Sequence, residues 1–166
     1  QERLIVAFSG SLKEFGVWQR KGIEQTHIVM NRVQQHFKGK IKIKYDLITQ
    51  ASYRDCIYRK SCADIVLDEC VTPSYHLTSL EGLALGRPTI CWTDERVEQM
   101  LYKVSGATTN PFLGTYVGWL EDYLVDMIEH GPQYLLQEGK KSKAWFNKYW
   151  KPQDVLQEYL DIYDSL

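Results

Sequence analysis

The sequence predicts a doubly wound, Rossmann-like α/β domain, with a parallel sheet covered by helices on both faces and a helical C-terminal tail. Three short apolar runs, at 3–8, 63–67 and 89–92, have the length and composition of buried strands. Segments with apolar residues at helical spacing lie between them. Strands that alternate with helices in this way need crossover connections, which are right-handed and place helices on both faces of a parallel sheet.

The first half of the sequence predicts three strands separated by two helices. The run at 3–8 predicts a buried strand, and the run at 63–67 predicts the third strand. Between them, apolar residues at 41–47 alternate with lysines, which predicts a strand with one wet face or at the edge of the sheet. The two helices are expected at 22–37 and 52–62.

The second half predicts a helix over 78–85, a strand over 89–92 and a helix over about 95–104. Beyond Asn110-Pro111 only helical patterns remain. They are expected at 116–129, from Gly131-Pro132 onwards and from about Pro152. No internal repeat and no low-complexity linker divides the chain, so residues 1–166 predict a single domain.

Composition limits the partners that this domain attracts. Lys and Arg total 20 against 21 Asp and Glu, and the net charge of −1 gives no general attraction to nucleic acid or to an anionic membrane. Any phosphate site must therefore be local. The four cysteines form no C-x-x-C pair and no histidine lies at zinc-finger spacing, which favours reduced thiols in a cytoplasmic protein.

The sequence predicts neither a secretory signal nor a membrane-spanning helix. The N-terminus opens directly on an apolar strand, without a secretory signal pattern, and no run approaches the roughly 18 apolar residues of a membrane-spanning helix. The abrupt start predicts that the chain is an excised fragment of a longer protein.

Ligands of an open parallel sheet bind beyond the carboxyl ends of its strands, so the loops there are the candidate sites. After the first strand come Ser9-Gly10-Ser11, then Lys13, Arg20 and Lys21-Gly22. Small residues let backbone N–H groups approach an anion, and the cations would neutralise it. An exposed polar loop is the alternative interpretation. In the loop after the second strand, Tyr53 could hold a nucleobase, but an ordinary strand-to-helix turn with Ser52 as N-cap is the favoured interpretation. Asp94 and Arg96, in the loop after the fourth strand, are interpreted as solvated charges at a helix start.

The loop at 68–79 leads into the short helix at 78–85. Thr78 and Glu81 have the spacing of a capping box, Gly86 is placed for a left-handed helix end, and Pro88 prevents continuation. His76 is the only histidine in these loops, and it is either catalytic or a partner of the backbone.

Lysines and aromatic residues alternate in the tail, between Lys140 and Lys151. This pattern suits either nucleic acid and lipid headgroups or an amphipathic helix whose apolar side lies on the domain and whose lysines face water. The amphipathic helix is the favoured interpretation.

Taken in order, Ser9-Gly10, Lys21-Gly22, the strand at 62–68 and the run at 79–90 resemble the C-terminal, donor-binding half of GT-B glycosyltransferases, and most of all the retaining group-1 families. The run SLEGLALGRPTI at 79–90 is similar to the family's S-x-E-A-M-A-x-G-x-P-V-I. The resemblance spans essentially the whole chain. It implies a donor domain for a UDP- or GDP-sugar that requires no metal, in glycan or polysaccharide biosynthesis.

The resemblance also implies roles for individual residues. Glu81 would bind the ribose hydroxyls, Lys21 and Arg20 would neutralise the diphosphate, and His76 would contact the sugar. The implied catalytic residues are Lys21, Glu81 and His76, and the implied nucleotide-binding residues are Ser9, Gly10, Arg20, Lys21, Thr78, Ser79, Leu80 and Glu81. Pro73 occupies the position of the first glutamate in the family's E-x7-E pattern. That departure leaves the stereochemistry and the sugar open, with Asp68 or Glu69 as substitutes.

The resemblance further implies that an N-terminal domain for a glycan or lipid-linked acceptor is absent, so the chain alone would be inactive and the tail helices would dock on that domain. The full-length enzyme would be cytoplasmic and peripheral to a membrane. Two alternatives remain open: a sugar-nucleotide epimerase of the same fold, and a flavodoxin-like or receiver-like binding module. Ser9-Gly10-Ser11 stands where a receiver has an acidic cluster.

Overall fold

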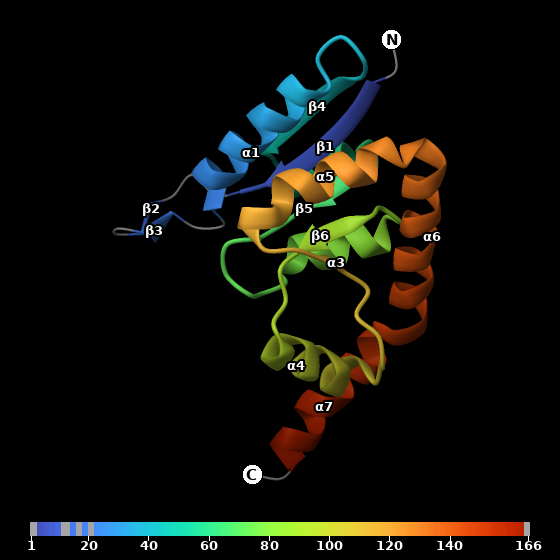
Figure 1. Cartoon of the computed structure of the whole chain (residues 1–166). Coiled ribbons are helices and arrows are strands. Elements are labelled where there is room, and N and C mark those ends of the chain that lie inside the picture. The colour runs from blue at the N-terminus through green and yellow to red at the C-terminus, as the bar shows by residue number, and fades with distance from the viewer. Residues whose placement is uncertain (1–2, 11–13, 16–17, 20–21, 165–166) are drawn as a thin grey trace.

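A five-stranded, entirely parallel sheet forms the centre of the molecule, in the order β4-β1-β5-β6-β7 (Figure 1). The computed structural model describes residues 3–10, 14–15, 18–19 and 22–164. The predicted α/β fold class is confirmed. The sheet strands are β1 (Arg3–Ser9), β4 (Lys42–Ile48), β5 (Ile65–Leu67), β6 (Thr89–Cys91) and β7 (Leu113–Gly114). A separate antiparallel hairpin joins β2 (Glu14–Phe15) to β3 (Trp18–Gln19).

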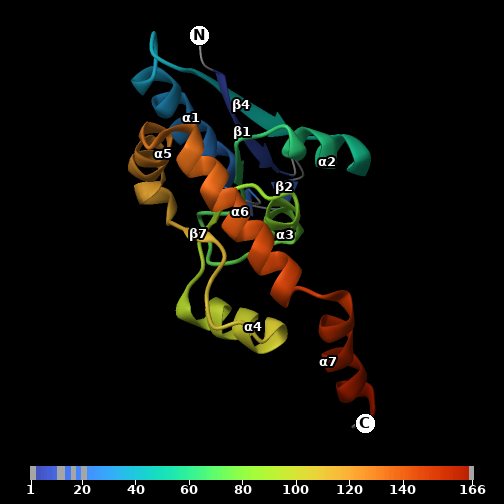
Figure 2. The ribbon, with the colours of Figure 1, turned by 90° about the vertical axis from the view of Figure 1, so that its right-hand side faces the viewer.

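Helices connect the strands and form the tail. They are α1 (Ile23–His36), α2 (Tyr53–Ser61), α3 (Leu77–Ala84), α4 (Glu95–Ser105), the 3-10 turn η2 (Val117–Trp119), α5 (Leu120–Glu129), α6 (Gly131–Tyr149) and α7 (Pro152–Asp164). Helices α1 and α5 lie on one face of the sheet, and α2 and α3 lie on the other (Figure 2). In the part of the chain that the structure describes, no helix is long and apolar enough to cross a membrane.

Alternate residues of β1 face the two layers, because successive side chains of a strand point to opposite faces. Val6 and Phe8 are fully buried in the cluster that includes Met30 of α1. Ala7 points the other way and packs with Ile48 and Ala63 on the α2 side. An uninterrupted apolar run is what a strand covered on both faces requires.

The order in which the chain adds strands to the sheet reverses at β1: β4 lies on one side of β1, and β5, β6 and β7 lie on the other. Phe8 lies opposite Leu47 of β4 on one side and Leu67 of β5 on the other. The connections through α1 and through α3 therefore leave the sheet on opposite faces, and sheets of this kind bind ligands beyond the carboxyl ends of the strands at such a point. Residues just after these two strands, from Ser9 and from Asp68, are thus brought to one place.

The local predictions hold at several helix ends. Ser52 caps α2 by accepting a hydrogen bond from the Asp55 N–H at 3.1 Å, and Asp94 caps α4 by accepting one from the Val97 N–H at 2.9 Å. Gly86 follows α3 with φ of 69°, as predicted for a left-handed residue at a helix end. The lysine-rich strand β4 is at the edge of the sheet, as predicted.

The prediction of helices alone beyond Asn110-Pro111 is wrong. Leu113 and Gly114 form β7, which pairs with β6 and completes the sheet. A strand of two residues has no periodicity to detect, and its position depends entirely on the neighbouring strand. Helix α5 also begins later than expected, because Val117–Trp119 forms a separate turn.

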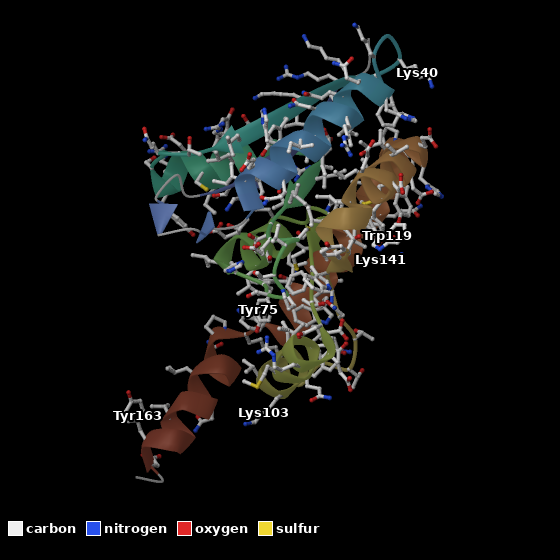
Figure 3. All side chains as sticks on the ribbon, turned by 60° about the vertical axis from the view of Figure 1, so that its left-hand side comes forward. Lys40, Tyr75, Lys103, Trp119, Lys141 and Tyr163 are labelled. Atoms are coloured by element: carbon white, nitrogen blue, oxygen red, sulfur yellow. The ribbon has the colours of Figure 1, made fainter. Side chains whose placement is uncertain are left out.

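The amphipathic interpretation of the lysine-rich tail is confirmed for α6. Trp145 is buried against Leu83 and Cys91, and its indole Nε1 donates to the Thr109 carbonyl at 2.8 Å. Lys143 lies on the wet side and donates to the Ala84 carbonyl at 2.7 Å, at the end of α3. Helix α7 then projects away from the sheet, with Leu156, Leu160 and Tyr163 exposed (Figures 1 and 3).

Candidate functional site

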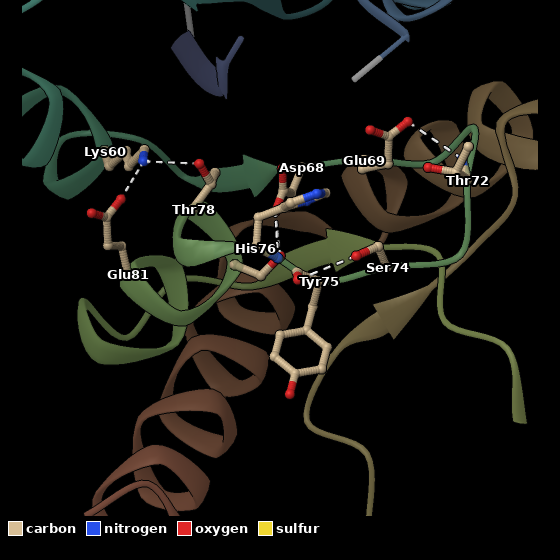
Figure 4. A network of polar contacts seen from close by, with 10 residues as sticks. Lys60, Asp68, Glu69, Thr72, Ser74, Tyr75, His76, Thr78 and Glu81 are labelled. Atoms are coloured by element: carbon tan, nitrogen blue, oxygen red, sulfur yellow. Dashed lines mark hydrogen bonds and ion pairs between the residues drawn. The ribbon is translucent and has the colours of Figure 1, made fainter. Parts of the chain in front are cut away.

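The carboxyl end of β5 is tied directly to the start of α3 by Asp68. This carboxylate is completely buried and accepts hydrogen bonds from the Ser79 hydroxyl at 2.6 Å and from the His76 backbone N–H at 3.2 Å (Figure 4). The His76 Nδ1 atom lies 3.3 Å from Asp68 Oδ2 but without hydrogen-bond alignment. Asp68 therefore fixes the N-terminus of α3 beside the carboxyl end of β5.

The predicted capping box of Thr78 and Glu81 is wrong. The residue that precedes α3 is His76, and no side chain caps the helix in the manner of a capping box. Thr78 and Glu81 instead turn to Lys60 of α2, whose Nζ donates to Glu81 Oε2 and, at 3.4 Å, to Thr78 Oγ1. A hydrogen bond between two ionised groups is stronger than one from a neutral backbone N–H. The Glu81 carboxylate therefore binds the Lys60 ammonium and not the backbone N–H groups at the start of its own helix.

The Lys60–Glu81 pair lies inside the protein. The Lys60 side chain is 1% exposed and that of Glu81 is 9% exposed. Glu81 Oε1, by contrast, forms no hydrogen bond with any residue that the structure describes. Glu81 thus has one oxygen anchored by the protein and a second oxygen available to a ligand.

Sequence reasoning missed Lys60. The segment YRDCIYRKS of α2 is polar over most of its surface, so a lysine in it has the pattern of a solvated charge. Only the packing of α2 beside α3 shows that Lys60 points inward while its neighbour Arg59 binds Asp46 of β4, at 2.7 and 3.0 Å. No feature of the sequence indicates this difference between Arg59 and Lys60.

Gly22 brings the start of α1 close to the loop after β5. It precedes α1 with φ of 57°, a conformation that glycine adopts without strain. A Cβ at this position would lie 3.2 Å from Val71 Cβ and closer still to Val71 Cγ2. The start of α1 therefore lies beside the loop that leads from β5 to α3.

The predicted site residues fall into three groups. Ser9 and Gly10 lie at the carboxyl end of β1, where the Gly10 N–H donates to the Ile48 carbonyl at 3.3 Å and Ser9 Oγ lies 3.7 Å from Cys56 Sγ. Leu80 packs at the margin of the Leu83 and Trp145 cluster. Thr78, Ser79 and Glu81 of α3 have the contacts given in the preceding paragraphs. Arg20 and Lys21 lie outside the part of the chain that the structure describes.

Glu69 is a second carboxylate at the same edge of the sheet. It is buried, and its Oε1 accepts a hydrogen bond from the Thr72 N–H at 3.3 Å. Burial raises the pKa of this carboxyl above its ordinary value, and the bond from Thr72 only partly offsets this. A carboxyl with a raised pKa is typical of functional sites.

We expect Glu69→Gln to stabilise the protein at neutral pH relative to the wild type. The folded-state pKa of Glu69 is raised, so its stabilising contribution is complete below the ordinary pKa and is lost as the pH rises through the raised one. The difference in unfolding free energy between variant and wild type should therefore grow upwards from about pH 4.5. Urea unfolding over a pH series measures it. Exposed Glu95→Gln is the control, and an equal rise in that variant would contradict the assignment to Glu69.

A cavity lies elsewhere in the molecule. It has a volume of about 610 Å³ and lies at the opposite, amino edge of the sheet, between the start of β1, the turn after α1 and the start of α6 (Lys40 marks this edge in Figure 3). Its charged lining residues carry both signs: Arg3, Lys40, Arg87, Asp64 and Glu129.

Among the described residues no group of three histidine, cysteine or acidic side chains is arranged to hold a metal ion.

Two solved structures resemble this chain in fold. A mutant of Staphylococcus aureus TarM, in complex with fondaparinux, α-GlcNAc-glycerol and UDP, matches 95% of this chain with a TM-score of 0.65 and 11% identity. Anabaena HepE, in complex with UDP-glucose, matches 99% with a TM-score of 0.61 and 12% identity. This chain shares the fold of the matched parts of these two proteins.

The likeness covers only part of each relative. This chain spans 34% of the TarM chain and 49% of the HepE chain. No protein-family model matches the sequence, and the comparison with curated proteins gives no match. At this identity the two structures establish the fold alone.

Proposed function

We propose that this chain is the donor-binding domain of a glycosyltransferase and binds a nucleotide-diphosphate sugar, with UDP as the nucleotide. The observation that carries the proposal is Glu81, held by Lys60 between α2 and α3 with Oε1 open to a ligand. The GT-B-like fold and the UDP and UDP-glucose bound to two proteins of that fold support it.

Glu81 suits the ribose of the donor. A carboxylate accepts hydrogen bonds at both oxygens, which matches the two adjacent hydroxyls of a ribose. The start of α1 lies against Val71 of the loop before α3, and the N–H groups and dipole of a helix start favour a diphosphate. In this proposal Arg20 and Lys21 supply the neutralising charge, without a metal.

The sugar end of the donor would lie near Glu69 and His76. Asp68 already accepts two hydrogen bonds in its buried position, so it serves to hold α3. His76 keeps 37% of its side chain exposed, and buried Glu69 is the carboxylate closest in sequence to the missing glutamate at Pro73. We propose His76 as the catalytic contact and Glu69 as the substitute carboxylate.

Transfer would need an acceptor domain from outside this chain. The projecting helix α7 offers Leu156, Leu160 and Tyr163, whose spacing places them on one side of the helix, as a surface for docking that domain. The proposed acceptor is a glycan or a lipid-linked sugar, and the proposed location of the whole enzyme is the cytoplasmic side of a membrane.

Calorimetry of this chain with UDP, GDP and ADP, with and without magnesium, tests the proposal. We expect UDP to bind without metal, and Glu81→Gln to weaken it about tenfold or more, because hydrogen bonds to a charged group are worth about 1.5–3 kcal/mol. Glu95→Gln, on the exposed side of α4, is the control and should bind as the wild type does.

Three results would contradict the proposal. A folded sample that binds none of the three nucleotides would exclude a donor domain that works alone. Binding that requires magnesium would favour the receiver-like alternative. Epimerisation of a UDP-sugar by the full-length protein, without any acceptor, would favour the epimerase.

A further inference from the structure

Lys60 is a deeply buried basic side chain near the candidate site. It belongs to the last turn of α2, which packs against α3, and its side chain is 1% exposed. Removing an ammonium and a carboxylate from water costs several kcal/mol each, and a buried pair of this kind is often no more stabilising than apolar residues of the same volume. Fold stability alone therefore gives a weak reason for a lysine here.

The contacts of Lys60 are directional. Both of its partners, Thr78 and Glu81, are on α3, and their spacing of three residues places them on one side of that helix (Figure 4). The ammonium lies between them and binds only Oε2 of the carboxylate. Lys60 thus fixes the rotamer of Glu81 and determines which oxygen remains open.

The open oxygen has the capacity that a ribose needs. A carboxylate offers about four lone-pair positions, and Lys60 uses one of those on Oε2. Oε1 and the unused position on Oε2 remain for two hydroxyl donors. Without the ammonium, Glu81 would lose the contact that holds it in this orientation.

We infer that Lys60 is a positioning residue that orients Glu81 and thereby makes the site prefer a ribonucleotide over its 2′-deoxy analogue. This inference rests on the proposed function. It assigns Lys60 no direct contact with the nucleotide. Its consequence is a change in selectivity between two ligands, which a merely structural role would leave unaltered.

The test compares UDP with 2′-deoxy-UDP by calorimetry on the wild type and on Lys60→Met. The wild type should prefer UDP about tenfold or more, which is the effect expected when a ligand loses a hydrogen bond to a charged group. Lys60→Met should reduce that preference to about threefold or less, because Glu81 is no longer oriented. Both ligands carry the same diphosphate, so changes in phosphate binding cancel in the ratio.

Arg59→Met is the matched control. Arg59 is the neighbour of Lys60 in α2 and also holds a carboxylate, Asp46, but it faces β4. This variant should keep the wild-type preference. Lys60→Gln, which leaves a neutral donor at the position, is measured in parallel and should also lower the preference. Circular dichroism establishes which variants are folded.

A double-variant cycle separates positioning from direct contact. Lys60→Met/Glu81→Gln leaves no buried unpaired charge, and it should show the same ratio as Glu81→Gln alone, since Lys60 acts only through Glu81. A further loss of UDP affinity in the double variant would overturn the positioning role.

The inference and the proposed function fail in different ways. If the wild type binds no UDP, the proposed function fails. If it binds UDP but shows no preference over 2′-deoxy-UDP, or if a folded Lys60 variant keeps the full preference, the inference is wrong while the donor domain stands.

Discussion

Replacing Lys60 by methionine is expected to lower the free energy of unfolding by about 3–5 kcal/mol, because it leaves the Glu81 carboxylate buried without its counter-ion. The exposed fractions of 1% and 9% exclude an ordinary surface salt bridge, whose loss would cost at most about 1 kcal/mol. Thr78 loses a partner in the same change. Urea unfolding at neutral pH, followed by circular dichroism, measures the effect.

The double variant Lys60→Met/Glu81→Met is the control for this prediction. It removes both charges and fills the space with apolar atoms, a replacement that is often neutral or stabilising in other buried pairs. We expect it to recover most of the stability lost in Lys60→Met. If single and double variants lost the same amount, the cost would come from packing around α2 and α3 and not from an uncompensated charge.

The parts of the fold that the sequence predicts are those controlled by neighbouring residues. Gly86, Ser52 and Asp94 act on the backbone within a few residues of themselves, and each is found at the helix end where local rules place it. The alternation of apolar runs and helical segments is equally local, and it is sufficient for the α/β class.

The parts that could not be predicted depend on contacts between distant segments. Strand β7 is two residues long and exists because β6 is beside it. Thr78 and Glu81 have the spacing of a capping box, but the spacing does not reveal an ammonium that arrives from a helix 21 residues earlier in the chain. A local motif fails where a stronger, non-local partner competes for the same oxygen.

In the candidate site, too, the sequence predicts what local rules control and does not predict contacts between distant segments. The sequence predicts the site at the ends of β1 and β5, and the structure brings these two ends to one edge of the sheet, because the carboxyl ends of parallel strands share one edge. The sequence does not reveal that Asp68 holds the start of α3, or that Lys60 holds Glu81. The roles proposed for Arg20 and Lys21 stay predictions.

Gly139→Ala is expected to destabilise the protein by about 1–3 kcal/mol, although the same change in a helix interior ordinarily stabilises by up to about 1 kcal/mol. Gly139 lies in α6 where this helix crosses the turn after α3. An added Cβ would lie 3.1 Å from the Gly86 carbonyl carbon and closer still to its oxygen, and 3.3 Å from Pro88 Cδ. Backbone atoms cannot move aside as a flexible side chain would.

The sign of the change in unfolding free energy is what makes the Gly139 experiment decisive. The exposed residue Ala144 of the same helix provides the reference, since it reports the effect of helix propensity alone. Ala144→Gly should cost about 1 kcal/mol through helix propensity alone, whereas Gly139→Ala should cost stability despite its better propensity. A more stable Gly139→Ala would contradict the close crossing of α6 and α3. Because α3 also carries Glu81, the displacement of α6 should weaken UDP binding in Gly139→Ala, while Ala144→Gly should bind UDP as the wild type does. Urea unfolding and calorimetry on the two variants measure both effects.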